Sequence, residues 1–243
     1  KAETTDIGGL IGHAVSSVHD ETGGSVIDNC TTLGEINSSG RAYDLGGTVG
    51  EGARLTITNT VNHIKVYGLC TAPDKESTTA GIVGRFTSGA IIDSTNDGII
   101  KTDVSNIYMT NTSSALAGGI AGVAVPLYDY GDFFQTIEIS GCLNKGALAS
   151  DRMGTITQAG IVVIMSRGVV SNCENQGKIQ NFTAYEGGAY GIIADGGTAT
   201  ITGCTNKADI LCSAQWAAGI AGFNRGTISE CSNWGAISSL QVA

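Results

Sequence analysis

Few residues in this chain have both the type and the spacing that catalysis requires. The three histidines are His13, His19 and His63, and the first two lie close to Asp20 and Glu21. A cluster of histidine and carboxylates can move protons, but a solvated loop explains the same residues. Motifs of serine hydrolases, zinc peptidases and phosphate-binding loops do not occur in the sequence. We therefore expect no catalytic residue, no metal site and no cofactor.

Two pairs of aspartates have a spacing that suits sugar cleavage. They are Asp129 with Asp132, and Asp93 with Asp97. Glycoside hydrolases use paired carboxylates, although any acidic loop supplies such pairs. A polysaccharide lyase also needs Lys or Arg beside its acids, and arginine is sparse here. A carbohydrate-active enzyme of either kind is therefore the alternative function.

Segment 126–134 is the most aromatic part of the chain and the best candidate for recognition. Its rings can stack on a sugar or a peptide while its carboxylates accept hydrogen bonds. The competing interpretation is that the rings fold the segment back onto the protein. Trp216, Tyr185 and Tyr190 could line the same face or another one. The predicted ligand-binding residues are Tyr128, Asp129, Tyr130, Asp132, Phe133 and Trp234.

A seven-fold internal repeat organises the whole chain. Each copy has an apolar doublet flanked by glycine, a short gap, β-forming residues, and then the pattern Cys-x-Asn-x-Gly-x-Ile, with exceptions. From one Asn slot to the next the steps are 30, 34, 48, 31, 31 and 27 residues. The copies span approximately 7–36, 45–66, 80–100, 117–148, 158–179, 187–210 and 217–237.

The repeat predicts an all-β fold. Each copy offers two or three short β-forming runs, and the 36 glycines disfavour helices. A fixed period of this kind is typical of stacked coils, each of which buries its apolar face against its neighbours. We expect one domain over 1–243, a single-stranded right-handed parallel β-helix (a β-solenoid) of about seven coils. The handedness is taken from the preference of parallel β connections.

Two slots of the repeat predict ladders of identical side chains. Asn suits a turn because it tolerates left-handed backbone, and stacked Asn amides can bond from coil to coil. The glycine two residues later suits a positive φ. Stacked cysteines would have parallel Cβ vectors, which is poor disulfide geometry, so buried free thiols are expected. The structural ladder comprises Cys142, Cys173, Cys204, Cys231, Asn144, Asn175, Asn206 and Asn233.

Composition excludes several classes of partner. The net charge is −9, and the 13 basic residues form no cluster, which argues against nucleic acid and anionic membrane surfaces. The sequence shows no signal-peptide pattern and no apolar run of spanning length, so we expect no direct membrane insertion. The repeat begins and stops close to both ends of the chain. We therefore expect a segment of a larger protein, with neighbouring domains that cap the solenoid.

The last copy carries a resemblance to a known family. The run 219–228, followed by Cys231-Ser232-Asn233-Trp234-Gly235, resembles the GLUG motif of bacterial surface proteins, including large adhesins. Ile64 and Ala208 depart from the motif, which prefers glycine there. The resemblance implies an exported β-solenoid, extracellular or on the bacterial cell surface, and transfers no catalytic residue. The predicted function is a non-enzymatic, adhesin-like stalk or ligand-presenting domain whose partner is a host protein or a glycan.

Overall fold

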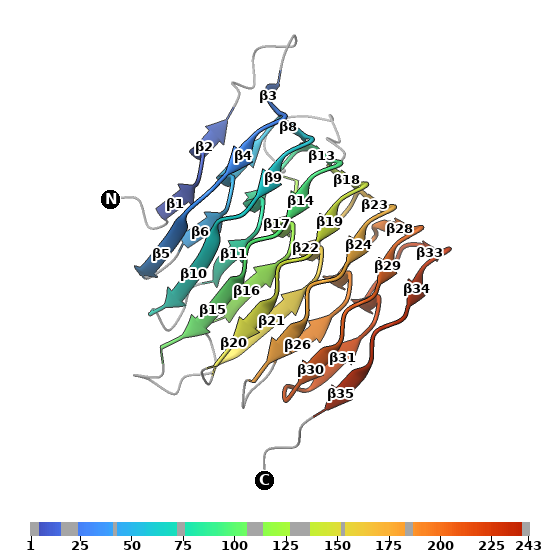
Figure 1. Ribbon diagram of the computed structural model, residues 1–243. Helices are drawn as coiled ribbons and strands as arrows, with labels where there is room; N and C mark the ends of the chain where they lie inside the picture. Colours follow the sequence, from blue (N-terminus) through green and yellow to red (C-terminus); the bar gives the residue numbers. More distant parts are fainter. Residues whose placement is uncertain are drawn as a thin grey trace.

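The protein is a parallel β-solenoid, and the all-β prediction is confirmed. In the residues that it describes, the computed structural model contains thirty-five strands, arranged in five parallel sheets of seven strands each. Figure 1 shows the strands stacked in chain order, with the two termini at opposite ends of the stack. No helix occurs in the part of the chain that is described. That part comprises residues 5–15, 24–40, 43–71, 76–105, 114–126, 137–151, 154–182 and 187–239.

Each passage of the chain contributes one strand to every sheet, so each strand pairs with the strand five places further on. We call the sheets A to E in the order in which the chain meets them. Sheet A contains β1 (Thr5–Gly8), β6 (Tyr43–Gly46), β11 (Glu76–Ala80), β16 (Ser114–Gly118), β21 (Thr155–Ala159), β26 (Gly187–Tyr190) and β31 (Trp216–Ala218). Sheet B contains β2 (Ile11–Val15), β7 (Val49–Ala53), β12 (Val83–Phe86), β17 (Ala121–Ala124), β22 (Val162–Met165), β27 (Ile193–Asp195) and β32 (Ala221–Phe223).

The remaining three sheets complete each passage. Sheet C contains β3 (Ser25–Asp28), β8 (Leu55–Thr58), β13 (Gly89–Ile92), β18 (Ile137–Ser140), β23 (Val169–Ser171), β28 (Thr200–Thr202) and β33 (Ile228–Ser229). Sheet D contains β4 (Thr31–Thr32), β9 (Val61–Asn62), β14 (Thr95–Asn96), β19 (Leu143–Asn144), β24 (Glu174–Asn175), β29 (Thr205–Asn206) and β34 (Ser232–Asn233). Sheet E contains β5 (Glu35–Gly40), β10 (Lys65–Cys70), β15 (Ile100–Val104), β20 (Leu148–Ser150), β25 (Ile179–Asn181), β30 (Ile210–Cys212) and β35 (Ile237–Ser239).

The turn between sheets C and D holds a left-handed residue in every passage. This residue directly precedes the Cys slot, and its φ lies between 48° and 63°. Asn, Asp and Gly, which tolerate this backbone best, fill most of these positions. The left-handed residues are Asn29, Asn59, Asp93, Gly141, Asn172, Gly203 and Glu230.

The prediction that left-handed backbone occurs at the Asn slot and at the glycine two residues later was therefore wrong. The Asn slot lies in the short strands of sheet D and has no positive φ. Of the glycines two residues later, only Gly34 has one. The others serve close stacking: a Cβ on Gly146 would lie 1.9 Å from the carbonyl oxygen of Gly98 in the preceding passage. Backbone packing, not backbone conformation, selects glycine there.

The buried apolar side chains of the described residues form four clusters. One lies between sheets B and C and includes Leu55 and Ile57, whereas sheets A and E enclose Ile100 and Leu148. From the second passage to the seventh, the Asn side chains of sheet D reach across the interior to the first glycine of the apolar doublet. A Cβ on Gly47 would lie 2.4 Å from Cγ of Asn62. The repeat thus pairs Asn with a glycine that makes room for it.

Candidate functional site

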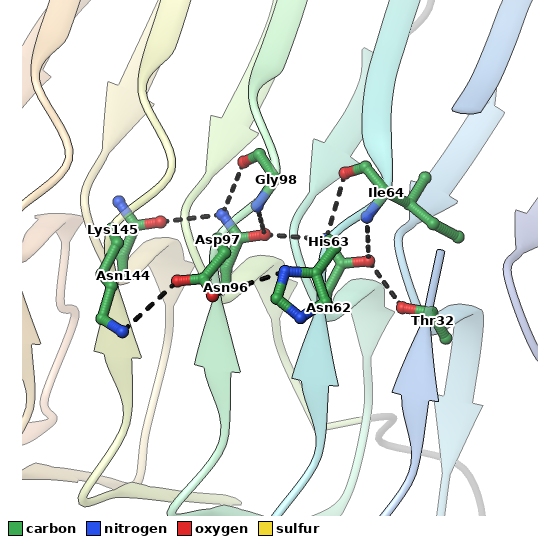
Figure 2. Close-up of polar contacts among 9 residues, drawn as sticks. All are labelled: Thr32, Asn62, His63, Ile64, Asn96, Asp97, Gly98, Asn144 and Lys145. Carbon is green, nitrogen blue, oxygen red and sulfur yellow. Dashed lines mark hydrogen bonds and ion pairs between the residues drawn. The ribbon is translucent and has the colours of Figure 1, made fainter. Parts of the chain in front are cut away.

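The Asn slot forms a continuous hydrogen-bonded ladder inside the protein (Figure 2). Asn62 Nδ2 donates to Asn96 Oδ1 at 2.7 Å, and Asn96 Nδ2 donates to Asn144 Oδ1 at 2.8 Å. The ladder continues in the same way through Asn175 and Asn206. All five side chains are fully buried. No ligand can reach them, so the ladder is a structural element.

A row of polar side chains lies on the surface one residue after the ladder. His63 Nδ1 lies 3.4 Å from Asp97 Oδ2, and Lys145 Nζ lies 3.5 Å from Asp97 Oδ1. Figure 2 shows this row beside the ladder. At the end of the row, Trp234 is 77% exposed and donates from Nε1 to Ser232 Oγ. Exposed ion pairs of this kind contribute little to stability.

The Cys slot faces the interior. Cys142, Cys173 and Cys204 are buried, whereas Cys231, in the last passage, is partly buried. The thiol of Cys142 donates to the carbonyl oxygens of Ile91 and Ser140. Hydrogen bonding to the thiols of Cys142 and Cys204, together with burial, raises the pKa of Cys173. All seven cysteines are free, and burial keeps these three away from solvent.

Most of the predicted ligand-binding residues lie outside the described part of the chain. These are Tyr128, Asp129, Tyr130, Asp132 and Phe133; the same holds for Tyr185 and for His19 with Asp20 and Glu21. Tyr190 and Trp216 are described, and they meet at a site that the repeat pattern did not single out.

That site is a groove on the outer surface between sheets A and B. The strands of the two sheets approach each other so closely that glycine is required between them. A Cβ on Gly12 would lie 2.9 Å from the carbonyl oxygen of Asp6, and one on Gly122 would lie 2.9 Å from Cβ of Thr78. Both are closing glycines, by which we mean the second of the two glycines that flank an apolar doublet of the repeat. The closing glycines therefore form the floor of the groove.

The groove widens where the closing glycine is replaced. Val163 and Ala194 occupy that position in the fifth and sixth copies, and both line a hollow of about 700 Å³. Its walls come from sheet A on one side and sheet B on the other. The other side chains that line it belong to Leu116, Thr157, Ile164, Tyr190, Asp195, Gln215, Trp216, Ala217, Ala218 and Phe223.

Three aromatic rings dominate the wide part of the groove. Trp216 is 58% exposed and Phe223 is 47% exposed, whereas Tyr190 is buried. The ring of Tyr190 fits because Gly188 and Gly222 lack side chains: a Cβ on Gly222 would lie 2.3 Å from Cε1 of the ring. Burial raises the pKa of Tyr190, so its hydroxyl stays protonated and able to donate a hydrogen bond at neutral pH.

Polar groups accompany these rings. The Asp195 carboxylate lies next to Phe223 in the register of sheet B and accepts a hydrogen bond from the Gly197 amide at 2.9 Å. The guanidinium of Arg225 lies 5.1 Å from the centre of the Phe223 ring. Gln215 adds an exposed amide. Exposed aromatic faces beside carboxylate and amide groups can bind a ligand that is part apolar and part polar.

The same interface between sheets A and B is strongly polar near the N-terminal end. His13 and Glu51 are paired neighbours in sheet B, and Asp6 lies across from them on β1. A ring nitrogen of His13 and one carboxylate oxygen each from Asp6 and Glu51 all lie within 4.8 Å of one another. Asp44, the neighbour of Asp6 in sheet A, is buried and bonded to Arg85, with Nε at 3.0 Å from Oδ2.

Reasoning from the sequence missed most of this groove. His13, Glu51, Arg85, Val123, Ile164, Asp195 and Phe223 are one column of the repeat, placed after the closing glycine. The sequence feature that could have revealed the groove is the variation of this column next to an otherwise regular motif. Comparisons with protein-family models, with curated proteins and with solved structures found no match to this chain.

Proposed function

We propose that the chain is a non-enzymatic binding module, and that the groove between sheets A and B holds a saccharide chain. The observation that carries the proposal is the hollow of about 700 Å³, whose opposite walls include Trp216 on the last described strand of sheet A and Phe223 on the last described strand of sheet B. An aromatic face packs against the C–H groups of a sugar ring, while carboxylates and amides bond its hydroxyls. Asp195 and Gln215 supply those polar groups beside the rings.

The same residues argue against catalysis. Glycoside hydrolysis requires two carboxyl groups about 5–10 Å apart across the scissile bond. Among the described residues that line the hollow, Asp195 is the only carboxylate, and the nearby guanidinium of Arg225 lies against the Phe223 ring, 5.1 Å from its centre. The groove therefore supports binding better than it supports hydrolysis or elimination.

The setting we propose for this module is the surface of a bacterial cell. The repeats that resemble the GLUG motif support that setting, as does the low content of charged residues in a stacked β architecture. Within the described residues no helix is long and apolar enough to cross a membrane. The module would act as an adhesin-like stalk, capped by neighbouring domains and presenting its groove to a host glycan.

We further propose that the solenoid has seven coils and a right-handed course. The five sheets of seven strands support the number of coils. The right-handed preference of parallel β connections supports the handedness.

A glycan array combined with a reducing-sugar assay tests the function. The intact protein should bind a defined set of oligosaccharides and release no reducing ends from them. Replacing both Trp216 and Phe223 by Ser should abolish binding, whereas Trp234→Ser, which removes the exposed ring outside the groove, should leave it unchanged. Release of reducing ends that depends on Asp195 would instead establish the enzymatic alternative. Binding that survives loss of both groove rings would rule out this site.

A further inference from the structure

We propose that Asp6, His13 and Glu51 form a binding site for one divalent metal ion at the polar end of the interface between sheets A and B. This goes beyond the proposed saccharide binding and does not depend on it. It also departs from the expectation of no metal, which rested on the cysteines and on the histidines as they appear in the sequence.

The geometry of the three side chains carries the inference. His13 Nδ1 lies 3.0 Å from Asp6 Oδ2 and 3.2 Å from Glu51 Oε2. One ring nitrogen carries at most one proton, so it cannot make a full hydrogen bond to both carboxylates. A metal ion bound by the nitrogen can contact both oxygens at once. Three protein ligands and an open fourth position are the usual arrangement of an accessible zinc site.

The strands hold these ligands in place. His13 on β2 is the direct partner of Glu51 on β7, and Asp6 on β1 faces them across the glycine floor. That approach is possible because Gly12 and Gly50 have no side chains: a Cβ on Gly50 would lie 2.6 Å from the amide nitrogen of Ile7. Ligands fixed on paired strands lose little conformational entropy when an ion binds.

A second observation at the same place concerns the hydrogen bonding of the Asp6 carboxylate. The other carboxylate oxygen of Asp6, Oδ1, is buried and finds no hydrogen-bond donor among the described residues. Buried carboxylate oxygens are normally satisfied. A metal ion bound by both oxygens of Asp6 would satisfy this atom.

The surrounding charges favour a cation. Arg85, the nearest guanidinium, is engaged with Asp44 at 3.0 Å and with Glu76 at 3.4 Å. His13 is 51% exposed at its side chain, so an ion can enter from solvent. One nitrogen and two carboxylates favour Zn²⁺ over Mg²⁺ or Ca²⁺.

Calorimetric titration of the full, tag-free chain with Zn²⁺ tests the site. We expect one Zn²⁺ per chain, and a loss of affinity of at least about tenfold in His13→Gln and in Glu51→Gln. Because thiols also bind Zn²⁺, the titration is repeated with Mn²⁺, which thiolates bind poorly, by following the free-ion electron paramagnetic resonance signal.

His63→Gln is the matched control. Its ring nitrogen also lies near a carboxylate, 3.4 Å from Asp97, but among the described residues it is close to only this one, and Lys145 supplies the positive charge. This variant should bind both ions like the parent chain. If His13→Gln melts early, Glu51→Gln, which preserves the shape of the side chain, decides the question. Absence of binding by the parent chain, or equal binding by His13→Gln, Glu51→Gln and His63→Gln, would overturn the proposal.

Discussion

At the scale of single residues, side chains with the same amide group have different roles according to the row they occupy. Asn175 accepts from Asn144 and donates to Asn206, both at 2.8 Å, and its Oδ1 also accepts from the Gly177 amide at 3.2 Å. It is fully buried. Gln176, the next residue, is exposed. The ladder therefore stabilises the fold, while its neighbour faces solvent.

Replacing Asn175 by Ala should lower the free energy of unfolding by about 3 kcal/mol. Three hydrogen bonds worth about 1 kcal/mol each are lost, and their buried partners stay unsatisfied. Urea unfolding followed by circular dichroism measures the change. Gln176→Ala should stay within about 0.5 kcal/mol of the parent chain. Equal stability of the two variants would show that the ladder is dispensable.

At the scale of elements, the sequence predicts which residues form a row but not which rows face each other. The period predicted stacked strands and the Asn and Cys ladders, because stacking preserves side-chain direction, but it indicated two or three β-forming runs per copy where the described chain has five strands. It did not place the left-handed turn, since Asn29, Asp93 and Glu230 share no residue type. It also did not reveal the groove. Trp216 and Phe223 belong to different sheets, and the repeat pattern does not predict that sheets A and B face each other there.

The glycines that line the interior should tolerate no side chain. A Cβ on Gly160 would lie 2.2 Å from the Gly191 carbonyl oxygen and 2.3 Å from Asn175 Cγ. Gly160→Ala should therefore destabilise the protein by at least about 1–3 kcal/mol, the usual range for overpacking. Gly40→Ala is the control, because a Cβ there meets nothing within 4 Å. Thermal melting of both variants measures the difference, and a similar melting temperature would contradict the packing described here.

The left-handed turn predicts a stabilising change. Glu230 has a φ of 55°, which costs a residue with a Cβ about 1–2 kcal/mol, whereas glycine adopts it freely. After the extra chain entropy of glycine, Glu230→Gly should gain about 0.5 kcal/mol. Glu138→Gly, in the strand β18, should instead lose about 0.5–1 kcal/mol. Urea unfolding that gave both changes the same sign would mean that the turn does not select glycine.

At the scale of the whole molecule, the solenoid separates stability from recognition. The buried Asn and Cys rows and the glycines packed against them hold the sheets together, and they recur in most passages of the chain. The outer column beside the closing glycine varies along the stack: Val123 is buried in an apolar cluster, whereas Arg85 pairs with Asp44. It changes from His13, Glu51 and Arg85 at one end to Asp195 and Phe223 at the other. Different ligands can thus be bound along one regular scaffold.

Tryptophan fluorescence during an oligosaccharide titration tests the central claim, that the groove is where this protein binds its ligand. The chain has two tryptophans, Trp216 in the groove and Trp234 outside it, so Trp234→Phe leaves one reporter in the site. Titration with the oligosaccharide that binds best on the array should change the emission of this variant in a saturable way. The Trp216→Phe variant, which reports from Trp234, should show no change. A saturable signal from Trp234 and none from Trp216 would contradict the account.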